Sequence, residues 1–174
     1  LKGRHHWNKR TEPDLEAGLS YFQQAIARDP SYAEAQGALA ECFVTLGLYG
    51  ARAPGEVMPQ ARAKAAEALA RQPHLPGALA TAACVEAVFG WAWEEAGARF
   101  RQAIALSPDA PAAHHWYAIN CLVPLGRFDE ARAELARALS ADPLSPAIVA
   151  TLGIAAYLER RYDVAEAELR KAMA

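Results

Sequence analysis

The sequence predicts an all-α fold built from stacked pairs of antiparallel helices, and three observations lead to this prediction. Apolar residues recur with the three- and four-residue spacing of a helix face, and no segment alternates with the period of a strand. A pattern of small and apolar residues returns along most of the 174 residues. Alanine supplies much of the 53% hydrophobic content, which favours helices that pack closely together.

The returning pattern defines the units. An alanine is followed by an apolar residue four positions later, by a second alanine after three more, and by a proline after a further five. The first three residues share one helix face, and the helix ends at the proline because the residue before a proline avoids helical backbone angles. The pattern occurs at Ala61, Ala65, Ala68 and Pro73; at Ala96, Phe100, Ala103 and Pro108; at Ala131, Leu135, Ala138 and Pro143; with glycine first at Gly18, Phe22, Ala25 and Pro30; and without the proline at Ala165, Leu169 and Ala172.

Each unit is expected to hold two helices joined by a tight turn, with an aromatic residue after the turn (Trp93, Phe128 or Tyr162) packed back between them. The first spacing between the repeated prolines is 43 residues and the next two are 35. We expect the Gly/Pro-rich segment 50–59 to take up the excess as a longer loop. Segment 1–8 is a poor first helix, and the expected helices are 13–28, 31–47, 56–71, 76–89, 92–105, 110–123, 127–140, 145–158 and 161–173.

The last unit carries a recognisable signature. Leu152 and Gly153 stand at its seventh and eighth positions, and the repeated Ala165, Leu169 and Ala172 stand at the twentieth, twenty-fourth and twenty-seventh. In this the chain resembles the tetratricopeptide repeat family from about Pro13 onward. The resemblance implies a single array that forms a right-handed superhelical solenoid, with a partial repeat at 1–30 and four full repeats at 31–73, 74–108, 109–143 and 144–174. The family's fourth-position Trp is replaced by Gln36, Leu79, His114 and Val149.

In that family the first helix of each repeat lines a concave groove that commonly binds a peptide. Carried over position by position, the predicted groove is mostly small and apolar, with two acidic residues at one end. It contains no Lys or Arg, so a clamp for a terminal carboxylate is not expected. The predicted groove residues are Glu34, Glu41, Val44, Thr45, Ala80, Cys84, Ala87, His115, Ile119, Asn120, Val123, Ala150, Ile154, Tyr157 and Leu158.

An apolar groove of this kind has three explanations. It holds an apolar peptide or partner protein. It is covered by another domain or by a second copy of the chain, which would make a homodimer. Or the groove is wound so tightly that it is part of the core. The sequence therefore predicts a protein-binding scaffold, with homo-oligomerisation of a parent protein as the alternative.

Composition and motifs argue against other classes. A net charge of −2 gives no electrostatic footprint for nucleic acid, and no apolar run is long enough to span a membrane. No nucleotide-binding, hydrolase or metalloprotease motif is present, so we expect no enzyme activity and no cofactor. His114 and His115 are adjacent and project about 100° apart on a helix, so a shared metal ion is not expected. The three widely spaced cysteines indicate a reducing compartment, and we expect a cytoplasmic location.

Four short sequence segments indicate a resemblance to a particular group of repeat proteins. Segments 5–11, 113–118, 125–131 and 142–146 are similar to the repeat arrays at the C-terminal ends of bacterial multidomain signalling proteins. Those proteins carry an upstream winged-helix, serine/threonine kinase or nucleotide cyclase domain. The resemblance implies that this chain is a fragment of a longer protein and acts as its docking or sensory part.

Overall fold

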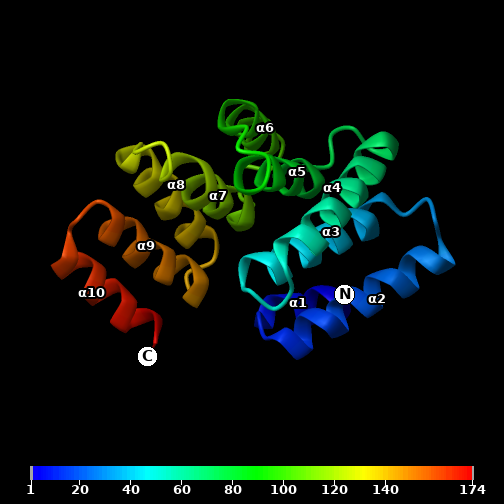
Figure 1. Ribbon diagram of the computed structural model, residues 1–174, viewed down its shortest axis with the longest axis horizontal. Coiled ribbons are helices and arrows are strands. Elements are labelled where there is room, and N and C mark those ends of the chain that lie inside the picture. The colour runs from blue at the N-terminus through cyan, green and yellow to red at the C-terminus, as the bar shows by residue number, and fades with distance from the viewer. Residues whose placement is uncertain (1, 174) are drawn as a thin grey trace. The chain divides into compact units, whose positions relative to one another are not determined.

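The computed structural model describes residues 2–173, which form helices and turns with no strand among them. The predicted all-α class is therefore confirmed (Figure 1). The Cα positions divide the chain into two compact units, Leu1–Ala92 and Trp93–Ala174. This boundary falls inside the predicted repeat 74–108, between its two helices. Among the described residues, no helix is long and apolar enough to cross a membrane.

The first unit contains five helices in which consecutive helices pack against one another, and α3 also packs against α5. Thr11 caps α2 by accepting a hydrogen bond from the Asp14 backbone N–H, and prolines open α4 and α5, where a missing N–H carries no penalty. The helices are α1 (Lys2–Lys9), α2 (Glu12–Arg28), α3 (Ala33–Leu48), α4 (Pro54–Arg71) and α5 (Pro76–Val88).

In the second unit, too, consecutive helices pack against one another. Prolines again open the first helix of each pair, and α9 lies beside α10 (Figure 1, orange and red). The elements are α6 (Trp93–Leu106), α7 (Pro111–Tyr117), a π-helical segment η1 (Ala118–Leu122), α8 (Phe128–Ala141), α9 (Pro146–Leu158) and α10 (Tyr162–Ala172).

The repeated small residues form the core of the helix pairs. Ala61, Ala65 and Ala68 are fully buried, and so are Phe100 and Leu135 at the central position of the pattern. Small side chains let the backbones approach closely, which is what the sequence pattern predicted.

The segment 50–59 is not the long loop that we expected. The helix α3 runs to Leu48 and α4 begins at Pro54, so most of the excess residues lengthen both helices, which have 16 and 18 residues against 13 and 14 in α5 and α6. Pro54 occupies a position at the helix start that suits proline, and Pro59 lies within the helix on its exposed side. The prediction of a long loop was wrong because proline was treated only as a helix breaker.

The expected single helix 110–123 also differs in the structure. Its second half is π-helical, with the Val123 N–H bonded to the Ala118 carbonyl five residues earlier at 2.9 Å. A π turn accommodates one extra residue within a helix. This agrees with the helix starts, since Phe128 lies 17 positions after Pro111 whereas Tyr162 lies 16 positions after Pro146 in the last repeat.

The aromatic residues after the turns do not all behave as predicted. Trp93 and Phe128 are half-buried, but Tyr162 is 57% exposed and lies beside Tyr157, with ring centroids 5.7 Å apart. The prediction therefore fails at Tyr162.

Candidate partner-binding face

In the first unit, the structure buries most of the predicted groove. Six of the seven predicted residues there are at most 5% exposed, and only Glu34 is exposed. The buried six cannot contact a partner while the unit keeps this packing, so we exclude them from the candidate site. They are Glu41, Val44, Thr45, Ala80, Cys84 and Ala87.

Helix α1 explains much of this burial. Trp7 is 6% exposed, and its indole Nε1–H donates to Thr45 Oγ1 at 3.1 Å. Arg4 forms an ion pair with Glu41, and Arg10 places its guanidinium 3.4 Å from the centroid of the Trp7 ring. Segment 1–8, which the sequence predicts to be a poor first helix, thus forms most of α1, and α1 with the following Arg10 supplies a tryptophan and two arginines to the face of α3.

Helix α5 closes the other side of this face. A Cβ atom added at Gly77 would lie only 2.8 Å from Glu41 Oε1, so the backbone of α5 approaches the buried carboxylate closely. In the first unit, then, the third explanation of the apolar groove applies, because the predicted groove residues are core.

In the second unit, the predicted residues of α7 and η1 are only partly accessible. His115 and Ile119 are half-buried, and Asn120 and Val123 are buried. The His115 ring Nε2 lies 2.7 Å from Thr151 Oγ1 on α9. Because the Thr151 hydroxyl donates to the Ala147 carbonyl, it accepts from the histidine, and this bond joins the first helices of two neighbouring repeats.

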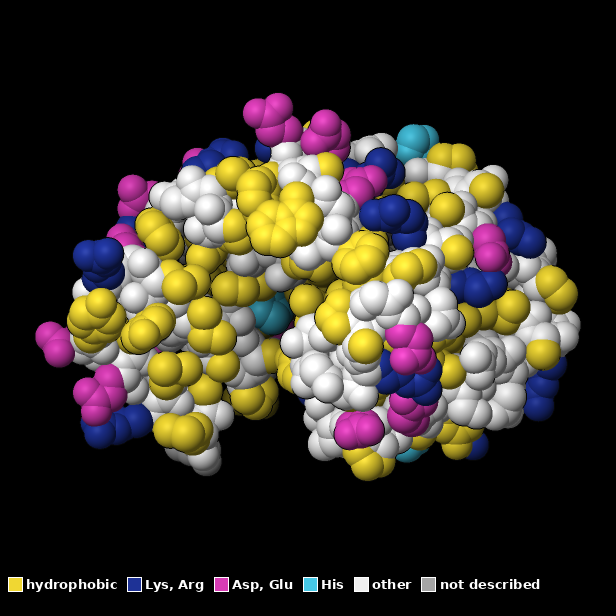
Figure 2. Space-filling model, viewed as in Figure 1, with side chains coloured by type: hydrophobic (Ala, Val, Ile, Leu, Met, Phe, Trp, Pro, Cys, Tyr) yellow, Lys and Arg dark blue, Asp and Glu magenta, His cyan; other side chains and the backbone are white. Residues whose placement is uncertain are grey.

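In the second unit, helix α9 carries the exposed residues of the predicted groove. Ile154, Tyr157 and Leu158 are 42%, 59% and 51% exposed, and Ala150 is half-buried one turn earlier. Spacing of three and four residues places them on one side of the helix. Figure 2 shows hydrophobic side chains gathered where Figure 1 places α9 and α10. We call Ile154, Tyr157 and Leu158 the α9 face.

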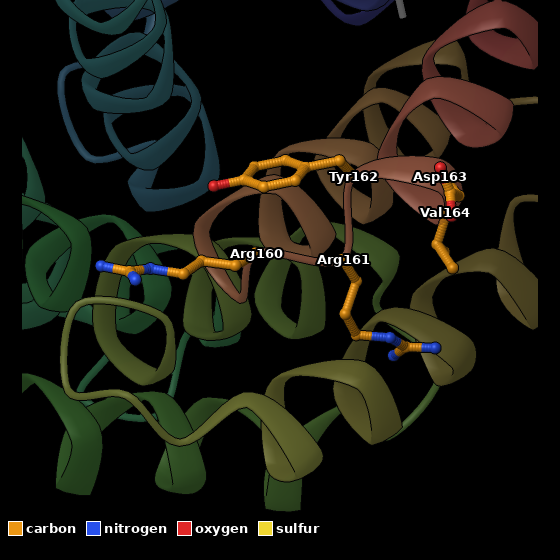
Figure 3. A pocket seen from close by; sticks show the side chains of 5 residues that line it. All are labelled: Arg160, Arg161, Tyr162, Asp163 and Val164. Carbon is orange, nitrogen blue, oxygen red and sulfur yellow. The ribbon is translucent and has the colours of Figure 1, made fainter.

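The α9 face ends at a turn whose backbone is fixed. Arg160 has a left-handed φ of 65°, its N–H bonds to the Tyr157 carbonyl, and the Arg161 N–H bonds to the Ala156 carbonyl, both at 2.9 Å. These two bonds are the Schellman arrangement that closes many helices. An open hollow follows the turn, lined by residues 160–164 (Figure 3).

The adjacent histidines separate as expected, one packed within the repeat and one on the groove side. His114 is 2% exposed, with one ring nitrogen on Glu134 and the other 2.7 Å from the Pro108 carbonyl. Gln36 occupies the same repeat position in the first unit and donates to the Pro30 carbonyl at 3.0 Å. These polar residues tie the helix to the preceding proline turn. The missing fourth-position Trp was the signal that could have revealed them.

The chemistry of the described residues gives no sign of a reactive centre. No group of three or more His, Cys, Asp or Glu side chains within 2–173 could hold a metal ion. The cysteines Cys42, Cys84 and Cys121 are buried free thiols, and burial raises the pKa of each. Raised pKa values disfavour the thiolate, which is the nucleophilic form.

Helix pairs with an exposed first-helix face define a helical-repeat protein of the kind that binds other proteins. Models of the tetratricopeptide repeat match residues 14–51 and 92–152, which together are more than half of the chain. The chain therefore belongs to the tetratricopeptide repeat family, whose members generally mediate protein–protein interaction. No curated protein matches the sequence.

Solved structures agree with this assignment. A thermophilic tetratricopeptide repeat protein of Thermus thermophilus is 25% identical with a TM-score of 0.60, covering 87% of this chain and 72% of that one. PilW, a type IV pilus biogenesis factor, is 20% identical with a TM-score of 0.69, covering 99% and 76%. YrrB is 20% identical with a TM-score of 0.57, covering 92% and 77%. The likeness to PilW and YrrB shows the fold alone.

Proposed function

We propose that this chain is a non-catalytic interaction scaffold that binds an apolar segment of a partner protein on the α9 face. The observation that carries the proposal is the exposure of Ile154, Tyr157 and Leu158 at repeat positions whose counterparts on α3 are buried. Burying such side chains from water stabilises a complex by about 25 cal/mol for each Å² of apolar surface. YrrB supports the proposal, since it is described as having an unusual peptide-binding site.

The neighbouring surface of the second unit fits the same role. His115 and Ile119 are half-buried between α7, η1 and α9, and Ala150 leaves room for a partner side chain. These residues would form the edge of the bound segment's site. We further propose that the chain is the docking or sensory part of a larger bacterial cytoplasmic regulator. The similarity of segments 113–118 and 125–131 to the repeat arrays of such proteins supports this proposal.

Selection of peptides tests the proposal. A displayed library of random peptides, each about 12 residues and long enough for three helical turns, is selected on the natural chain and on Ile154→Glu. We expect the natural chain to enrich apolar peptides and Ile154→Glu to lose them, because a carboxylate would have to be desolvated beneath the peptide.

The matched control is Leu106→Glu on α6. Leu106 is 44% exposed, close to the 42% of Ile154, but it lies on a second helix of a repeat. The Leu106→Glu variant should enrich the same peptides as the natural chain. If Ile154→Glu enriches the same peptides as the natural chain, the α9 face is not the binding site.

Self-association is the second candidate function, and one observation favours it. Val164, Leu169 and Met173 on and just after α10 are 38%, 36% and 80% exposed, so the last helix also presents apolar side chains. Light scattering over a wide concentration range separates the two functions. A stable dimer that dissociates on Met173→Glu would favour oligomerisation, and a monomer at all concentrations would exclude it.

A further inference from the structure

The turn after α9 holds an arginine side chain with no acidic partner. Arg160 forms neither an ion pair nor a side-chain hydrogen bond with any residue in 2–173. Its neighbour Arg161 approaches Glu159 at 3.5 Å, and Glu159 is also held by Arg132. The carboxylate of Glu159, next to Arg160 in the sequence, is therefore already paired with other arginines.

Folding of the turn does not require this arginine. Gly126 fills the corresponding place in the preceding repeat, where it has a φ of 71° and the following N–H makes the same bond to a carbonyl five residues back. Glycine adopts a left-handed φ without strain, whereas a residue with a Cβ is destabilised there by about 1 kcal/mol. The turn thus carries a charged side chain at a position where the sister repeat has none.

The direction of this side chain links it to the α9 face. In Figure 3 Arg160 and Tyr162 extend to the same side of the turn, whereas Arg161 points away from them. The Tyr162 ring lies against Tyr157, which belongs to the α9 face. The Tyr162 hydroxyl makes no hydrogen bond to a described residue and is a second donor beside the guanidinium.

We infer that the segment bound on the α9 face carries an Asp or Glu side chain, which binds Arg160 and Tyr162 at the end of α9. This inference rests on the proposed function and specifies the partner further. A carboxylate matches the planar fork of a guanidinium and accepts from a phenol at the same time. A nucleic acid would require several unpaired cations, whereas in this turn only Arg160 lacks an acidic partner among the described residues, and Glu159 and Asp163 lie nearby in the sequence.

The acidic residue gives the bound segment a direction. Apolar side chains of the segment cover Ile154, Tyr157 and Leu158, and its acidic residue lies beyond Leu158 at the turn. An amphipathic or extended segment with two or three apolar residues followed closely by Asp or Glu satisfies both parts of the site.

The same displayed library tests this inference. Its peptides are fused at their C-termini and have no free terminal carboxylate, so any carboxylate comes from Asp or Glu. We expect peptides enriched on the natural chain to share an acidic residue at a fixed distance from their apolar residues. A synthetic peptide of the enriched sequence should bind Arg160→Gln about tenfold more weakly than the natural chain.

The control is Arg161→Gln, which removes the adjacent arginine that points away. It should leave the affinity within about twofold, since its partner Glu159 keeps the bond to Arg132. Replacing the peptide's acid by its amide should weaken binding to the natural chain about tenfold and leave binding to Arg160→Gln unchanged.

The outcomes separate the two proposals. If enriched peptides depend on Ile154 but carry no shared acid, or if Arg160→Gln binds them as the natural chain does, the inference is overturned and the scaffold function stands. If the natural chain enriches no peptides that Ile154→Glu loses, the proposed function fails and the inference falls with it.

Discussion

Replacing Gly153 by alanine tests how closely α9 and α10 approach one another. A Cβ atom at Gly153 would lie 2.6 Å from Leu169 Cγ and 3.2 Å from the Ala165 carbonyl oxygen. The first distance is well inside van der Waals contact, so the Leu169 side chain would have to move. The second involves backbone, which moves less readily. Gly153 thus sets the separation of the last helix pair.

The expected magnitude comes from two opposing effects. Overpacking by one methyl group costs about 1–3 kcal/mol, and alanine gains about 1 kcal/mol over glycine within a helix. In the natural chain, Gly153→Ala should therefore lower the free energy of unfolding by up to about 2 kcal/mol. In a Leu169→Ala background the main clash is absent, and Gly153→Ala should raise the free energy of unfolding by up to about 1 kcal/mol.

The measurement is urea unfolding of the four chains in this cycle, followed by far-ultraviolet circular dichroism. The coupling between positions 153 and 169 should be about 1–3 kcal/mol. Gly55→Ala is the control, because no atom lies within 4 Å of a Cβ at Gly55, near the start of α4. Equal effects of Gly153→Ala in both backgrounds would refute the close-approach argument.

Two further predictions concern the first unit. Trp7→Phe should lower the unfolding free energy by about 1–3 kcal/mol in urea titrations, because phenylalanine cannot donate to Thr45 and fills less of the buried site; a change below about 0.5 kcal/mol would contradict the role given to α1. Burial raises the pKa of the Cys42 thiol from 9.0 to about 12, so the unfolded chain loses this proton at lower pH than the folded chain does. Stability from this group is complete below pH 9 and should fall as pH rises towards 12, by up to about 3 kcal/mol at pH 11. Cys42→Ala should have a flatter profile in denaturation at increasing pH, and identical slopes for the two chains would count against the raised pKa.

Local signals explain why most of the fold could be predicted. The alanine faces are buried because residues at these spacings point to one side of a helix, as at Ala61, Ala65 and Ala68. The prolines mark where helices stop and also where the next ones start, as at Pro76 and Pro146. Both effects depend on neighbours in the sequence, so the sequence alone was sufficient for them.

The π segment could not be predicted in this way. The repeat 109–143 has one residue more between its helix starts than the last repeat, but nothing in the segment Ala118–Leu122 says where the extra residue is accommodated. A lengthened turn and a π turn satisfy the same residue count. Packing of η1 against α6 and α8 distinguishes them, and that packing is a property of the folded unit.

The burial of the candidate site residues also could not be predicted from the sequence alone. Glu41 and Ile154 hold the same repeat position, and residue polarity alone predicts an exposed acid and a buried isoleucine. The structure has the reverse, with Glu41 5% and Ile154 42% exposed. What covers each position decides the result: Arg4 compensates the buried Glu41 charge, and no described side chain covers Ile154 to the same degree.

This inversion is itself an argument for where binding occurs. A buried acid held by an arginine fixes the face of α3 against α1, because separating the pair would leave a charge in an apolar site. The α9 face has no such restraint, and covering Ile154, Tyr157 and Leu158 would remove apolar surface from water without breaking a polar contact of theirs. A partner that covers the α9 face therefore gains the free energy of apolar burial without a compensating loss of polar contacts.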